Sequence, residues 1–148
     1  MMKEKFIEIV TRVAECLGYK LVEFYVNEKH KKVNIVIYKK TGITVQDCED
    51  MTKELLHNIE FYDRFRNNYD IEVSSPGVQR EFKSINEYKI FEGKEVKIIT
   101  DYKETPVITG VLKGIEDKNK IVVEDGFKIY KIPYVHIKRG KLIFNFTF

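Results

Sequence analysis

The sequence is poor in the residues that define several classes of protein. Its 148 residues include two cysteines, three prolines, eight glycines and no tryptophan. Two cysteines are too few for a disulfide scaffold or for a four-ligand zinc site. The low proline and glycine contents exclude collagen-like and linker-rich chains. No apolar run approaches the roughly 18 residues that a membrane-spanning helix needs, so we expect no membrane association.

An excess of charge of one sign is also missing. The chain has 26 basic and 23 acidic residues, a net charge of +3, and this balance does not by itself indicate nucleic-acid binding. Residues 1–90 are balanced, so the positive excess lies in residues 91–148. Nine tyrosines and ten phenylalanines supply material for a core. The first residues, Met1 to Lys5, show no signal-type apolar stretch, and we expect a cytoplasmic protein.

Residues 1–75 show a regular alternation of helical and strand patterns. Apolar residues recur at helical spacing over Glu4–Leu17 and again over Val45–Ile59, and a polar loop is expected after the second helix. Strand patterns cover residues 22–26, 33–38 and 69–73. A helical crossover would make the third strand parallel to the second. We therefore expect an α+β domain of order helix-strand-strand-helix-strand, with two helices on a three-stranded sheet.

The sequence Ser74-Ser75-Pro76-Gly77 interrupts this pattern, because Pro76 cannot donate to a strand ladder and Gly77 permits a sharp turn. A short amphipathic helical stretch follows, and residues 76–91 are interpreted as a connector. From residue 92 to 148 the period is two, with turn signals between short strands. Five such strands predict a small all-β barrel that closes its own edges. The strands are expected at 96–98, 107–112, 121–123, 127–132 and 142–148.

No grouping of residues indicates catalysis. His30, His57 and His136 have no partner at a nucleophile or metal spacing. Cys16 and Cys48 lie on apolar helical stripes and are predicted to be buried structural thiols. Neither a phosphate-binding glycine loop nor a converging pair of carboxylates is present. We expect no enzymatic activity, cofactor, metal or small-molecule substrate.

Basic residues are the remaining candidates for binding. Lys29, Lys31 and Lys32 fall at the tip of the first hairpin, and Lys138, Arg139 and Lys141 fall in the predicted barrel. Arg80 and Lys83 follow the Pro-Gly turn. The constrained backbone would direct Arg80 either to a phosphate or carboxylate of a partner, or to a contact that joins the two domains. Both interpretations are open. The uncovered sheet face, with Tyr25 and Tyr38, is a poor platform for RNA because it also carries carboxylates.

Four segments of the sequence follow a known family pattern, in order along nearly the whole chain: Leu21–Phe24, Gly42–Glu49, Tyr69–Gly77 with Arg80, and Phe91–Val96. Together they resemble the RimP family of bacterial ribosome maturation factors. The resemblance implies an N-terminal α/β domain and a C-terminal SH3-like (Sm-like) barrel. It also implies non-enzymatic binding to the free small (30S) ribosomal subunit, through 16S-type ribosomal RNA and a ribosomal protein near the decoding region. Gln79 and Glu81 depart from the family's usual Asp and Pro around Arg80.

Two other functions are compatible with these patterns. A general RNA-binding module of Sm-like type would use residues 91–148 as its reader. An SH3-like protein-interaction module would need exposed aromatic residues, for which Phe144, Phe146 and Phe148 are candidates. The expected state is a monomer.

Overall fold

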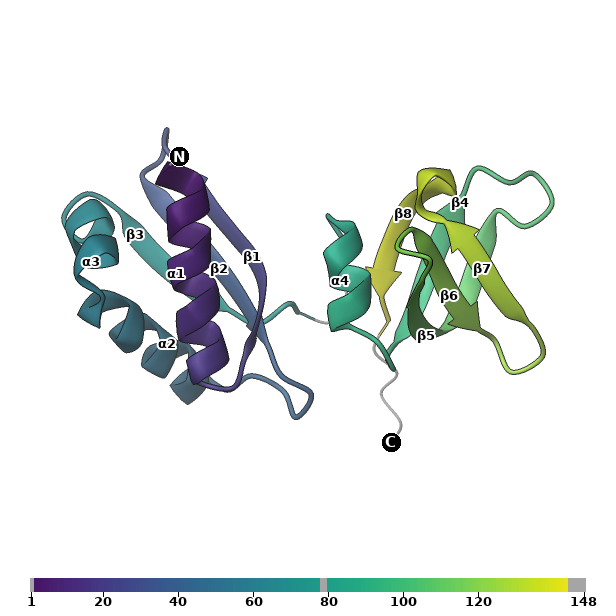
Figure 1. Cartoon of the computed structure of the whole chain (residues 1–148), viewed down its shortest axis with the longest axis horizontal. Coiled ribbons are helices and arrows are strands. Elements are labelled where there is room, and N and C mark those ends of the chain that lie inside the picture. The colour runs from purple at the N-terminus through teal and green to yellow at the C-terminus, as the bar shows by residue number, and fades with distance from the viewer. Residues whose placement is uncertain (1, 78–79, 144–148) are drawn as a thin grey trace. The chain divides into compact units, whose positions relative to one another are not determined.

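The structure is a computed structural model that describes residues 2–77 and 80–143 (Figure 1). The chain forms two compact units, Met1–Pro76 and Gly77–Phe148. None of the helices in these described ranges is long and apolar enough to cross a membrane.

The first unit contains a three-stranded sheet with helices on one face (Figure 1). Strand β2 lies in the middle, antiparallel to β1 and parallel to β3. The predicted fold class and the predicted crossover are confirmed. The elements are α1 (Met2–Cys16), β1 (Lys20–Asn27), β2 (Lys32–Tyr38), α2 (Val45–His57), α3 (Ile59–Phe65) and β3 (Asp70–Ser74).

The core of this unit forms because every second residue of β2 faces the helices. Val33, Ile35 and Ile37 are fully buried, and they cluster with apolar residues of α1, α2 and α3. Phe65 of α3 lies at the centre of an aromatic group, with ring centroids 5.1 Å from Phe6 and 4.9 Å from Phe61. Burial of each such side chain contributes roughly 1.5–3 kcal/mol.

Helix α3 occupies the region where the sequence predicts a polar loop. Asn58 has extended backbone angles and ends α2. Its side chain then accepts a hydrogen bond from the backbone N–H of Phe61, at 3.0 Å, and so caps α3. The sequence prediction of two helices is therefore corrected to three, because one asparagine both ends a helix and starts the next.

The start of α2 is held by a network around Asp47. Thr44 and Asp47 form a capping box, in which Asp47 Oδ2 accepts from the Thr44 backbone N–H at 2.8 Å. Asp47 Oδ1 also accepts from the Tyr19 hydroxyl at 2.8 Å and from Lys39 Nζ at 3.3 Å. The Thr44 N–H, followed by the Tyr19 hydroxyl, holds the pKa of Asp47 well below its usual range. Burial and the bond to Asp47 raise the pKa of Tyr19 to about 12.

Stability of the first unit should therefore depend on the charge of Asp47. Its pKa is lower in the folded state, so the ionised carboxylate stabilises the fold above its unfolded pKa of about 4. We expect Asp47→Asn to lower the thermal unfolding midpoint at pH 7, and the difference from wild type to shrink as the pH falls below 4. Differential scanning calorimetry over pH 2–7 measures both. The exposed Glu49→Gln on the same helix is the control; equal pH profiles for Asp47→Asn and wild type would contradict the argument.

The second unit is a five-stranded antiparallel sheet with one short helix (Figure 1). The strand order is β7-β6-β5-β4-β8. In the residues described, no ladder pairs β7 with β8, so the predicted closure into a barrel is not detected. The elements are α4 (Ile85–Ile90), β4 (Glu95–Thr100), β5 (Val107–Glu116), β6 (Lys120–Glu124), β7 (Ile129–Pro133), a 3-10 turn η1 (Tyr134–His136) and β8 (Ile137–Leu142).

Strand β8 lies earlier in the chain than the final strand predicted at 142–148. Residues 138–141 are charged or glycine, so the sequence predicts a turn near Gly140. In the structure, Gly140 and Leu142 instead pair with Ile98 and Val96, two buried residues of β4. Lys141, between Gly140 and Leu142, and Arg139, before them, point to the opposite face of the sheet. Residues Phe144, Phe146 and Phe148 lie outside the described residues.

Residues 80–91 pack within the second unit. The backbone N–H of Phe82 donates to the carbonyl of Gly140, and that of Leu142 donates to Arg80, so this segment runs beside β8. The Phe82 ring stacks on Phe91, with centroids 5.4 Å apart, and meets the Tyr88 ring edge to face. The division of the chain at 75 and 91 into two domains and a connector stays a prediction.

Candidate functional site

The hairpin between β1 and β2 carries the first predicted basic cluster, and Lys29 and Lys31 are exposed there. Lys32 forms an ion pair with Glu72 of β3, with Nζ and Oε2 2.7 Å apart. Lys31 lies 3.9 Å from Glu28. Lys29 has no ion pair with any described residue. That this cluster binds a partner stays a prediction, and two of the three lysines have acidic neighbours that reduce their attraction for phosphate.

Two residues of this tip were not predicted, Glu28 and Arg64. Glu28 accepts a hydrogen bond from the Tyr69 hydroxyl and another from Arg64 Nη2, at 3.2 Å. The Tyr69 hydroxyl, and then Arg64, lower the pKa of Glu28. Arg64 also lies 5.1 Å from the ring centres of Phe65 and Tyr69. Arg64 comes from α3, 36 residues away from Glu28, and no sequence pattern links the two.

The second predicted cluster lies on the face of the sheet opposite the core of the second unit. Arg139 and Lys141 are on this face, and Lys97 of β4 lies directly opposite Lys141. Lys97 was missed because its register with β8 cannot be read from the sequence. Arg139 donates to both carboxylate oxygens of Glu81, at 3.0 and 3.2 Å. Lys138, which precedes Arg139 in the chain, is exposed. Lys97 and Lys141 therefore lie on the same sheet face as this ion pair.

Arg80 does not extend from the turn toward solvent. Its Nε donates to Glu87 Oε1 at 2.8 Å, and the two side chains are only 9% and 2% exposed. Glu87 also accepts from the backbone N–H of Lys83 at 2.9 Å. Both residues of this pair belong to the second unit, so the pair fixes the 80–83 segment on α4.

The remaining predicted positions are spread along the chain. Lys83 and Ser75 are exposed, and Ser74 ends β3 opposite Val36. Pro76 is half-buried, and Gly77 has a φ of +80°, which favours glycine. Tyr25 is 51% exposed, whereas Tyr38 is only 7% exposed and is not available for stacking.

The described residues contain no group of three or more possible metal ligands. His136 Nδ1 lies 3.1 Å from Asp101 in an exposed pair. Cys48 is half-buried and burial raises its pKa. The prediction of a buried thiol is wrong for Cys16, which is exposed because it is the last residue of α1.

A comparison with protein-family models matches residues 9–79 to the RimP N-terminal domain. The matched segment begins within α1 and extends past β3, so it contains the complete sheet of the first unit.

Proposed function

Because residues 9–79 form a RimP N-terminal domain, we propose that this chain is a ribosome maturation factor that binds the free small (30S) ribosomal subunit during its assembly. Membership of the RimP family implies a ribosome maturation factor, and the family is one of non-catalytic assembly factors. The family match carries the proposal. The three-stranded sheet with its helices supports it, because the resemblance to the RimP family implies an N-terminal α/β domain.

The proposed action is non-covalent. A protein that binds one conformation of an assembling particle more tightly than the others raises the population of that conformation. Ribosomal RNA and a ribosomal protein near the decoding region are the proposed contacts, and the bacterial cytoplasm is the proposed location. The exposed lysines of the hairpin tip and those around Arg139 are the proposed contacts with RNA phosphates.

Co-sedimentation with separated ribosomal fractions tests this function. We expect the full-length protein to associate with free small subunits and to be absent from joined ribosomes. Failure to associate with free small subunits at low salt would contradict the proposal. Equal binding to short single-stranded RNA would instead favour a general RNA-binding module of Sm-like type.

The contribution of the hairpin tip can be measured with Lys29→Glu/Lys31→Glu. Both side chains are exposed, so the fold should be retained. We expect the affinity for free small subunits to fall at least fivefold, and the salt dependence of binding to decrease by about one unit for each lost phosphate contact. Lys53→Glu/Lys103→Glu, at two exposed positions away from the tip, is the control, because it changes the net charge by the same amount. An unchanged affinity in the double variant would exclude the tip as an RNA contact.

A further inference from the structure

A pocket of about 340 Å³ opens in the first unit, where α1, the end of β1 and α3 meet. Four aromatic rings contribute to its wall, and Phe65 among them is 2% exposed. One acidic and one basic side chain complete it. The lining residues are Phe6, Phe24, Tyr25, Val26, Glu28, Arg64 and Phe65.

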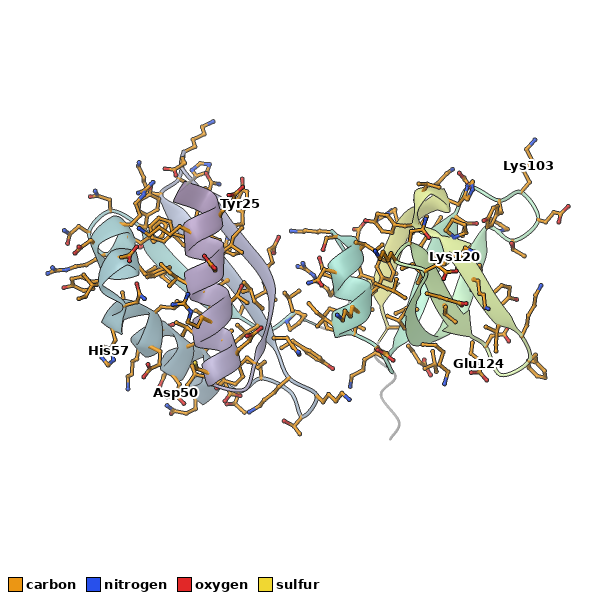
Figure 2. All side chains as sticks on the ribbon, viewed as in Figure 1. Tyr25, Asp50, His57, Lys103, Lys120 and Glu124 are labelled. Atoms are coloured by element: carbon orange, nitrogen blue, oxygen red, sulfur yellow. The ribbon has the colours of Figure 1, made fainter. Side chains whose placement is uncertain are left out.

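Three consecutive residues of β1, the outermost strand of its sheet, line the pocket. Side chains of successive strand residues point to opposite faces of a sheet. Phe24 and Val26 pack against the core, so the alternation places Tyr25 between them on the other face. Tyr25, labelled in Figure 2, is 51% exposed. From β1 the pocket is therefore lined by residues that belong to both faces of the strand.

The backbone of β1 can form further hydrogen bonds at the edge of the sheet. Among the described residues, β1 pairs with β2 alone and is the outermost strand of its sheet. Alternate residues of an edge strand direct their N–H and C=O groups away from the sheet. An apolar pocket and a row of backbone donors and acceptors thus lie side by side.

We propose that β1 binds an extended segment of a partner protein as an additional strand, with one large apolar side chain of that segment in the pocket. Main-chain hydrogen bonds would supply affinity, and the pocket would select the side chain. The choice of probes rests on the proposed function, because peptides from small-subunit ribosomal proteins are the natural source.

The charges around the pocket favour a polypeptide over RNA. Its lining holds one carboxylate and one guanidinium, and Arg64 Nη2 is bonded to Glu28 Oε1 at 3.2 Å. The lining therefore offers no excess of positive charge for phosphates. The polar pair at one end can instead accept or donate hydrogen bonds to a peptide.

The test uses the full-length protein and an array of overlapping 12-residue peptides from the small-subunit proteins of the same source. The peptide that binds best is added to isotope-labelled protein. We expect chemical-shift changes within β1, and at least tenfold slower hydrogen exchange for alternate amides of residues 21–27. Strand β3, the other edge of the sheet, is the internal control and should be unchanged.

Tyr25→Ala removes the exposed ring at the rim of the pocket and should weaken peptide binding about tenfold. Phe127→Ala removes an aromatic ring that is 100% exposed in the second unit, and should have no effect. Thermal unfolding confirms that both variants fold.

Two results would overturn the inference: no peptide slows exchange in β1, or an RNA fragment does so in place of any peptide. If either occurs while the protein still sediments with free small subunits, only this inference fails. A peptide bound at β1 by a protein that does not sediment with subunits would refute the proposed function and leave the strand-addition site in place.

Discussion

Gly140→Ala is expected to destabilise the second unit by about 3 kcal/mol, the upper part of the range for overpacking a filled core. Gly140 lies in β8, where an added Cβ would overlap the hydroxyl oxygen of Tyr88 and lie 2.8 Å from its Cζ. Tyr88 cannot move aside easily, because it is 2% exposed and its ring contacts Phe82 and Tyr134. Only glycine leaves room for this tyrosine. Denaturant unfolding of the full-length protein measures the loss.

A second substitution separates this contact from a general effect on the strand. Tyr88→Phe removes the atom that an alanine at position 140 would overlap, so Gly140→Ala/Tyr88→Phe should regain part of the stability lost by Gly140→Ala. Lys138→Ala, at an exposed position of the same strand, should change stability by less than about 0.5 kcal/mol. A Gly140→Ala variant as stable as wild type would show that Tyr88 has space to move.

Arg80→Ala should also be strongly destabilising, by about 3 kcal/mol, because it leaves the Glu87 carboxylate buried without its cation. Had Arg80 contacted a phosphate of the ribosome, its removal would lower affinity with no loss of stability. Because Arg80 is buried in a pair with Glu87, with Nε and Oε1 2.8 Å apart, we expect Arg80→Ala to lower stability more than it lowers affinity for the small subunit. Denaturant unfolding and co-sedimentation of the same variant distinguish the two roles.

The exposed pair formed by Arg139 and Glu81 offers a matched control. The Arg80–Glu87 pair lies within residues 80–87, and the Arg139–Glu81 pair joins the same segment to β8, but the side chains of Arg139 and Glu81 are 64% and 51% exposed. We expect no measurable stability loss from Arg139→Ala. Arg80→Met/Glu87→Leu should lose less stability than Arg80→Ala, since neither charge then stays buried. Equal losses in Arg80→Ala and Arg139→Ala would refute the structural role of Arg80.

Patterns within a segment predicted much of this fold. The alternation of Val33, Ile35 and Ile37 identified the central strand, and a helical crossover made the third strand parallel to it. Helix α3 was missed because Asn58 interrupts the apolar period, and a cap that serves two helices does not differ in sequence from a loop residue.

The candidate site was harder to predict than the fold, because it depends on contacts between segments that lie far apart in the sequence. The position of Lys97 opposite Lys141 depends on a strand register that no spacing encodes. Arg80 was a candidate because it follows the Pro-Gly turn, but its buried partner Glu87 does not differ in the sequence from a surface glutamate of a short helix. Local patterns predict elements, and burial decides which charges are available to a partner.

The bulge in β1 bears on how the protein resists aggregation. A flat, unpaired edge strand can recruit the same strand of another copy, and sheets then grow without limit. In β1 the register shifts between Leu21 and Glu23, and the strand begins with the exposed Lys20. A bulge bends and twists its strand, so two copies could not align along their full length. The irregularity protects a concentrated solution from edge-to-edge growth, while the regular stretch from Phe24 to Val26 keeps its backbone groups accessible.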